Sequence, residues 1–114
     1  MSARPRPGAA GKRTQAHVFA ALGEETRLTL VARLSGGDRQ SITELASGSR
    51  LTRQAITKHL QLLESAGLVR SRRSGREHLF EFRPEAIVDA QKYLAGVALQ
   101  WDQALNRLKR FVED

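Results

Sequence analysis

Apolar positions recur at spacings of three and four residues through most of the chain, which predicts a mainly helical protein. Each segment with this spacing carries polar residues on its other side, as expected for helices that cover a shared core. The predicted helices cover residues 15–22, 24–35, 42–47, 53–66 and 84–112. Leu28, Val31, Ala32 and Leu34 are expected to form the inward face of the second helix.

Polar residues and glycines mark the ends of these helices. Ser41 and Glu44 have the spacing of a capping box at the start of the third helix. Thr52 fits the N-cap of the fourth helix, and Gly67 fits the left-handed residue that follows its end. The central helices are therefore short and separated by tight turns.

A β-hairpin is predicted between the fourth and last helices. Residues 69–73 and 77–82 flank the turn Ser74-Gly75, and Phe80 and Phe82 alternate with polar residues, so they are expected to face the core. The first strand and the turn carry four arginines, which have little use in packing: Arg70, Arg72, Arg73 and Arg76.

The last predicted helix carries a long apolar seam. Ile87, Leu94, Trp101 and Leu108 recur every seven residues, which is typical of helix–helix pairing. A helix of this length spans about 43 Å, against a diameter of about 34 Å for a domain of this size, so part of the seam is expected to contact another chain. The predicted dimer surface consists of Val18, Phe19, Leu22, Ile87, Leu94, Val97, Trp101, Leu105 and Leu108.

The 114 residues suffice for one domain, and their composition narrows its chemistry. We expect a disordered basic tail over residues 1–14 and a folded domain over residues 15–114. No apolar run reaches the length of a membrane span, so a cytoplasmic, nucleoid-associated protein is expected. The absence of cysteine excludes disulfides and thiolate chemistry. Because catalytic and phosphate-loop motifs are also absent, we expect no enzyme, no cofactor and no metal.

Positive charge is concentrated in two segments. The chain has a net charge of +7, yet residues 1–15 contain four basic and no acidic residues, and residues 50–76 contain seven basic residues and one acidic residue. The remainder is net negative. This distribution favours a polyanionic partner.

Two short helices joined by a tight turn and followed by a basic hairpin predict a winged helix-turn-helix, in a mainly α fold with a small β-hairpin wing. The second helix of such a pair enters the major groove of double-stranded DNA, where Arg and Gln side chains can read guanine and adenine. The wing is expected to contact the flanking backbone. The candidate DNA-binding residues are Thr52, Arg53, Gln54, Thr57, Lys58, His59, Arg72, Arg73 and Arg76. His59 borders the core, so a structural role for it is an equal alternative.

Four segments resemble the ArsR (arsenic-repressor) family of bacterial winged-helix regulators. They are residues 18–28 (VFAALGEETRL), 42–46 (ITELA), 55–69 (AITKHLQLLESAGLV) and 74–80 (SGREHLF). The resemblance runs from about His17 to Val112. It implies a homodimeric repressor that binds an imperfect inverted repeat, with the first and last helices forming the dimer.

The chain departs from the family pattern at two places. Helix-turn-helix units commonly carry glycine where this chain has Arg50, and the glycine here is Gly48, so either the preceding helix ends early or Arg50 is left-handed. The cysteine pair of one family metal site is replaced by residues 43–45, and the last helix has Asp89 and Asp102 but no histidine. Neither metal site carries over, and a small-molecule inducer stays open.

Two other functions fit parts of the pattern. A general nucleoid or RNA-binding protein could use the same basic surface, although exposed aromatic side chains for base stacking are missing. A protein-interaction adaptor could act through the last helix alone. The first alternative predicts weak sequence discrimination, and the second predicts no effect of changing Gln54 and Thr57.

Overall fold

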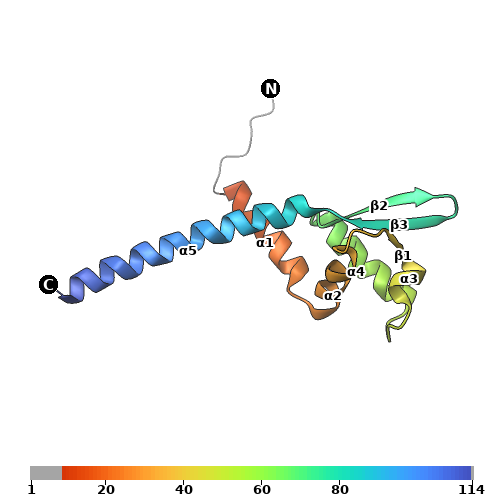
Figure 1. The fold of residues 1–114 in the computed structure, drawn as a ribbon, viewed down its shortest axis with the longest axis horizontal. Helices are drawn as coiled ribbons and strands as arrows, with labels where there is room; N and C mark the ends of the chain where they lie inside the picture. The colour runs from red at the N-terminus through yellow and green to blue at the C-terminus, as the bar shows by residue number, and fades with distance from the viewer. Residues whose placement is uncertain (1–8, 114) are drawn as a thin grey trace, which may run out of the picture.

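The computed structural model describes residues 9–113. These residues form five helices and a three-stranded antiparallel sheet (Figure 1). The predicted mainly α fold with a hairpin wing is confirmed. In chain order the elements are α1 (Ala9–Leu22), α2 (Glu25–Leu34), β1 (Gln40–Ser41), α3 (Ile42–Ala46), α4 (Arg53–Ser65), β2 (Val69–Ser74), β3 (Glu77–Phe82) and α5 (Pro84–Glu113).

Helix α1 begins earlier than the sequence pattern predicted. It starts at Ala9 instead of Gln15, so residues 9–14, which we expected in the disordered tail, are helical. Alanine, lysine and arginine within this stretch favour helix, and the apolar periodicity used for the prediction does not extend to them. The predicted tail over residues 1–8 lies outside the described residues.

The predicted caps fix the ends of the central helices. Ser41 and Glu44 form the expected capping box at α3, with both reciprocal bonds at 3.1 Å. The Thr52 hydroxyl accepts a bond of 3.1 Å from the Ala55 backbone N–H at the start of α4. At the other end of α4, Gly67 has φ +78° and the Leu68 N–H donates to the Leu63 carbonyl, which completes a Schellman motif.

The turn between α3 and α4 settles the choice between Gly48 and Arg50. Gly48 has φ +76°, and no non-glycine residue within residues 9–113 has a positive φ. The first helix of the pair therefore ends early, at Ala46, and Arg50 is not left-handed.

The wing is a hairpin extended by a strand that the sequence did not predict. β3 pairs with β2 on one side and with the two-residue strand β1 on the other, through Gln40↔Phe80 and Ser41↔Leu79. Ser74 pairs with Glu77, so the hairpin loop is Gly75-Arg76, one residue later than predicted. Gly75 has φ +61°, which suits the first position of a two-residue hairpin loop.

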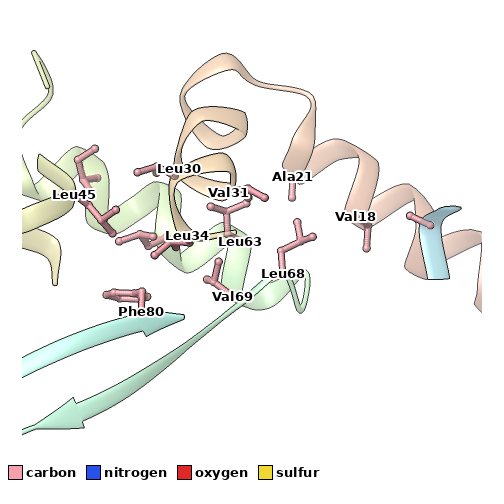
Figure 2. Packing of buried hydrophobic residues seen from close by; sticks show 13 residues of the cluster. Val18, Ala21, Leu30, Val31, Leu34, Leu45, Leu63, Leu68, Val69 and Phe80 are labelled. Atoms are coloured by element: carbon pink, nitrogen blue, oxygen red, sulfur yellow. The ribbon is translucent and has the colours of Figure 1, made fainter. Parts of the chain in front are cut away.

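The core lies where α1, α2, α3 and α4 meet the inner face of the sheet (Figure 2). Ile56, Leu60 and Leu63 of α4 are buried there as predicted, and Phe80 reaches it from β3. In α2 the prediction was partly wrong, because Leu28 and Ala32 are exposed and Leu30 is buried instead. The buried stripe of α2 is thus narrower than its apolar content suggests.

The first turns of α5 pack on this core, and the rest of the helix projects away from it (Figure 1). Ala86, Ile87 and Ala90 contact the core, and Tyr93 lies beside Phe19 of α1 with ring centroids 6.2 Å apart. The radius of gyration is 18.7 Å, above the value of about 13 Å for a compact domain of this length. None of the described helices is long and apolar enough to cross a membrane.

Several predicted seam residues of α5 are exposed in the single chain. Trp101 is 64% exposed, and Val97 alone among the distal seam residues is partly buried. The exposed members are Leu94, Trp101, Leu105 and Leu108, and Phe111 and Val112 extend the same stripe.

The assignment of Val18 to the dimer surface requires correction. Val18 is only 2% exposed and belongs to the core of its own chain, because it lies on the inner side of α1. Phe19 and Leu22 are partly buried against the same core.

Candidate nucleic-acid interface

Helix α4 presents a polar face to solvent along its N-terminal half. Thr52, Arg53, Gln54 and Lys58 are exposed and Thr57 is half-buried, while the opposite face packs into the core. These residues line an open hollow of about 670 Å³ together with Ile42 of α3, Ala55 and Gln61. The predicted recognition residues of α4, apart from His59, are therefore brought together on one surface.

The side chains of this face differ in how they are held. The Thr52 hydroxyl caps the helix, and the Thr57 hydroxyl donates to the Arg53 carbonyl at 2.8 Å. The side chains of Arg53, Gln54 and Lys58 make no hydrogen bond or ion pair with other residues of the described chain. Their donors and acceptors are thus available to an external partner.

The pleat of the wing separates its arginines onto two faces. Arg70 and Arg72 share the outer face with Glu81, whereas Arg73 lies opposite His78 on the face that continues the core side. The carboxylate of Glu81 is 3.0 Å from Arg39 Nε and 3.6 Å from Arg72 Nε, and it also accepts from Arg70. The hydrogen bond from Arg70, above all, lowers the pKa of Glu81. Part of the positive charge predicted for the wing is therefore neutralised on the outer face.

A second hollow, of about 150 Å³, lies between the wing tip and the recognition helix. Arg53 of α4 and Arg76 of the hairpin loop line it, together with Thr43 of α3 and with Glu77 and His78 of β3. The Arg73 side chain donates to the Gly75 carbonyl at 3.5 Å, and Arg73 is exposed to solvent. The inner side of the wing tip thus continues the polar surface of α4 with further positive charge.

His59 lies apart from this surface. Its Nδ1 atom is 3.2 Å from Arg27 Nη1 and 3.8 Å from Glu24 Oε2, both of which belong to the start of α2. These contacts support the structural alternative for His59. Sequence reasoning missed Arg27 and Glu24 because their partner is more than thirty residues away along the chain.

Residues 9–113 contain no group of three histidine, aspartate or glutamate side chains placed to hold a metal ion.

Comparison with known proteins shows to which class of proteins this chain is similar. The helix-turn-helix domain family matches residues 22–72, which run from the end of α1 into β2. The HTH-type transcriptional regulator YuzN of Bacillus subtilis (strain 168) is 37% identical over 81 residues, which cover 66% of this chain and 88% of that protein. The solved structure of an ArsR-like transcriptional regulator from Rhodococcus sp. RHA1 is 34% identical, with a TM-score of 0.84 over 93% of this chain and 96% of that one.

The chain belongs to the ArsR family of winged helix-turn-helix transcriptional regulators. This regulator carries a DNA-binding fold, and its relatives are regulators and not enzymes. The homodimeric winged helix-turn-helix DNA-binding domain Mb0332 of Mycobacterium bovis is also similar, at 26% identity and a TM-score of 0.64, over 94% of this chain and 95% of that one.

Proposed function

We propose that the regulator is a homodimeric repressor that binds an imperfect inverted repeat in double-stranded DNA, with α4 in the major groove and the wing on the flanking backbone. The observation that carries this proposal is the exposed face of α4, on which Arg53, Gln54 and Lys58 have no partner among residues 9–113. The major groove is about 12 Å wide and admits one such helix.

The polar side chains of α4 divide by the contacts that they can make. Arg53 can bond guanine through its two terminal nitrogens, and Gln54 can bond adenine through its amide. Lys58 lies one turn further along and suits a phosphate oxygen. The Thr57 methyl group fits contact with thymine while its hydroxyl stays bonded to the Arg53 carbonyl.

The wing supplies positive charge beside this helix, on both faces of the hairpin. Arg73 and Arg76 reach the backbone or the minor groove from the inner side of the tip, where Arg76 already lies beside Arg53. Arg72 contacts the backbone from the outer face and shares its charge with Glu81. Replacing Arg76 by Ala weakens binding to all DNA sequences by a similar factor. It also reduces the slope of log K against log salt concentration by about one unit per protomer.

The dimer places two such surfaces on one duplex. The apolar stripe of α5 is exposed in the single chain, and the similar Mycobacterium bovis domain is homodimeric. A two-fold axis through α1 and α5 lets two recognition helices meet successive major grooves about 34 Å apart. An inverted repeat is the DNA sequence with matching symmetry.

This repressor acts without the metal sites of its family. The chain has no cysteine, and α5 contains no histidine, so the donors that bind zinc or arsenite in those sites are missing. Micromolar zinc or arsenite therefore leaves the DNA complex intact in a gel-shift titration. Stoichiometric, DNA-releasing binding of either would contradict this part of the proposal.

Selection of bound duplexes from fragmented genomic DNA tests the proposal as a whole. We expect an enriched inverted repeat whose half-sites lie one helical turn apart. Equal recovery of all fragments would instead support a general nucleic-acid-binding protein. Unchanged regulation by a Gln54→Ala, Thr57→Ala variant would support an adaptor acting through α5.

A further inference from the structure

Arg27 joins three helices through one guanidinium group. It lies in the first turn of α2, and its Nε donates to the Ala21 carbonyl at the end of α1 at 2.7 Å. Its Nη2 lies 3.5 Å from the Ala20 carbonyl, and its Nη1 lies 3.2 Å from Nδ1 of His59 on α4. A continuous set of hydrogen bonds thus connects α1 to α4 through α2.

The end of this connection lies behind the DNA-facing surface. His59 is two positions after Thr57, which places the two side chains about 200° apart around α4. The His59 side chain is only 22% exposed. It can therefore set the position of α4 against α1 without approaching a DNA duplex itself.

The bond between Arg27 and His59 requires one protonation state of the imidazole. A guanidinium group only donates, so Nδ1 must accept, and the proton of the neutral ring lies on Nε2. A second proton on Nδ1 removes the acceptor and places two cations against each other. Glu24 Oε2, 3.8 Å from Nδ1, is then the carboxylate that attracts the charged ring.

Glu24 keeps its charge when His59 is protonated, and the nearby His17 and Glu64 are bonded to other residues. Glu24 remains ionised in mildly acidic solution, because the hydrogen bond from the Arg27 backbone N–H lowers its pKa. On α1, His17 Nε2 lies 3.3 Å from Ser65 Oγ, and on α4 itself Glu64 accepts from Ser71. Among residues 9–113, Arg27 and Glu24 are the charged residues in hydrogen-bond or ion-pair contact with the His59 ring.

We propose that Arg27 and His59 are positioning residues for DNA recognition. They hold α4 in a fixed place against α1 while His59 is neutral, and protonation of His59 breaks this bond and draws the ring to Glu24 instead, which shifts α4 from that place. This inference rests on the proposed function, in which α1 belongs to the dimer and α4 reads the duplex. The link then fixes the recognition helix relative to the two-fold axis, and mild acid weakens operator binding.

Binding of the duplex selected at about pH 8 provides the main test, measured by fluorescence anisotropy between about pH 8 and about pH 5.5, where histidine changes charge. The His59→Asn variant is the matched control, because the Asn oxygen can accept from Arg27 and does not titrate. We expect the wild-type Kd to rise about five-fold or more over this range relative to His59→Asn. Equal pH profiles of the two proteins would overturn the proposal.

Two further variants separate this link from other histidines and from general damage. Arg27→Met keeps the alkyl stem and loses the donors, so it binds weakly at pH 8 and loses nothing more on acidification. His17→Asn, on α1, retains the wild-type profile, because His17 is bonded to Ser65 and lies outside the proposed DNA surface. Loss of the pH dependence in His17→Asn, or full binding by folded Arg27→Met at pH 8, would contradict the inference.

Nitrogen NMR of the DNA-free wild type tests the link without reference to DNA. We expect the neutral His59 ring to carry its proton on Nε2, with Nδ1 as the acceptor. A proton on Nδ1 at pH 8 would overturn the inference even if operator binding is normal. Conversely, the expected tautomer together with failure to select any duplex would refute the proposed function and with it the role in recognition.

Discussion

At the scale of single residues, Glu81 neutralises part of the positive charge on the outer face of the wing. Three arginines from two segments of the chain surround its one carboxylate. Without this acid, Arg39, Arg70 and Arg72 would repel one another on the outer face of the sheet. Glu81 therefore joins the hairpin to the segment before β1.

We expect Glu81→Gln to destabilise the regulator at neutral pH and to make little difference in strong acid. The pKa of Glu81 is lowered from 4.5, chiefly by the hydrogen bond from Arg70, so its stabilising contribution is present above this ordinary value and disappears as pH falls through the lower folded value. Thermal unfolding of both proteins across this range measures the effect. Glu77→Gln on the same strand is the control, and an equal effect of that change would contradict the assignment.

Gln54 provides the residue-scale test of base reading. Replacing it by Ala costs about 1–3 kcal/mol on the selected duplex if its amide bonds adenine, and much less on random duplex. Gln61→Ala, which alters the same residue type further along the same face, is expected to have a smaller effect. Anisotropy titrations on both duplexes measure the difference, and equal losses on the two would disprove base reading by Gln54.

The sequence predicted the exposed face of α4 but not the partners of His59. Helical periodicity places Arg53, Gln54 and Lys58 opposite Ile56 and Leu60, because burial of the apolar stripe fixes the rotation of the helix. Contacts between distant segments leave no such period. The pairing of His59 with Arg27 therefore needed the tertiary structure.

At the scale of elements, two glycines show opposite uses of the same residue. Gly67 ends α4 with φ +78°, whereas Gly96 lies inside α5 with helical geometry. A Cβ atom at either position meets nothing within 4 Å, so backbone conformation alone decides the effect of adding one.

We predict that Gly67→Ala destabilises the fold by about 1–2 kcal/mol, because a left-handed alanine is strained. Gly96→Ala instead stabilises it by about 0.5–1 kcal/mol, because alanine favours helix. Chemical denaturation of both variants measures the two effects. Shifts of the same sign would show that these backbone arguments do not govern α4 and α5.

Element boundaries could be predicted where a cap or a glycine marks them. The Ser41 capping box, the Thr52 cap and Gly67 did so, and the structure confirms all three. β1 was not predicted, because a strand of two residues is too short to show alternating apolar and polar positions. The hairpin loop was placed one residue too early, because the position of Gly75 within a two-residue loop depends on strand pairing.

At the scale of the whole molecule, the projecting part of α5 is the surface through which we propose that two chains pair. We expect Trp101→Asp to abolish dimerisation and operator binding together, because it buries an unpaired charge in the proposed seam and costs about 3–5 kcal/mol. Trp101 is 64% exposed in the single chain, so folding of the monomer is spared. Sedimentation velocity at micromolar concentration measures the change.

Gln103→Asp, on the polar side of the same helix, is the control for Trp101→Asp and should remain dimeric. A Trp101→Asp protein that sediments as the wild type does would refute the role of α5. The sequence could predict this helix and its stripe from length and heptads, but it misplaced Val18, since a pattern along one helix does not tell an intramolecular neighbour from a second chain.

The exposed stripe of α5 also gives the regulator a dependence on its own abundance. If only paired chains span both half-sites, operator occupancy at low expression rises with the square of the protein concentration and not in proportion to it. Halving the cellular amount then reduces repression about four-fold in that regime. In the proposed dimer, the length of one helix, set by thirty residues without a break, would thereby determine how sharply a promoter responds to gene dosage.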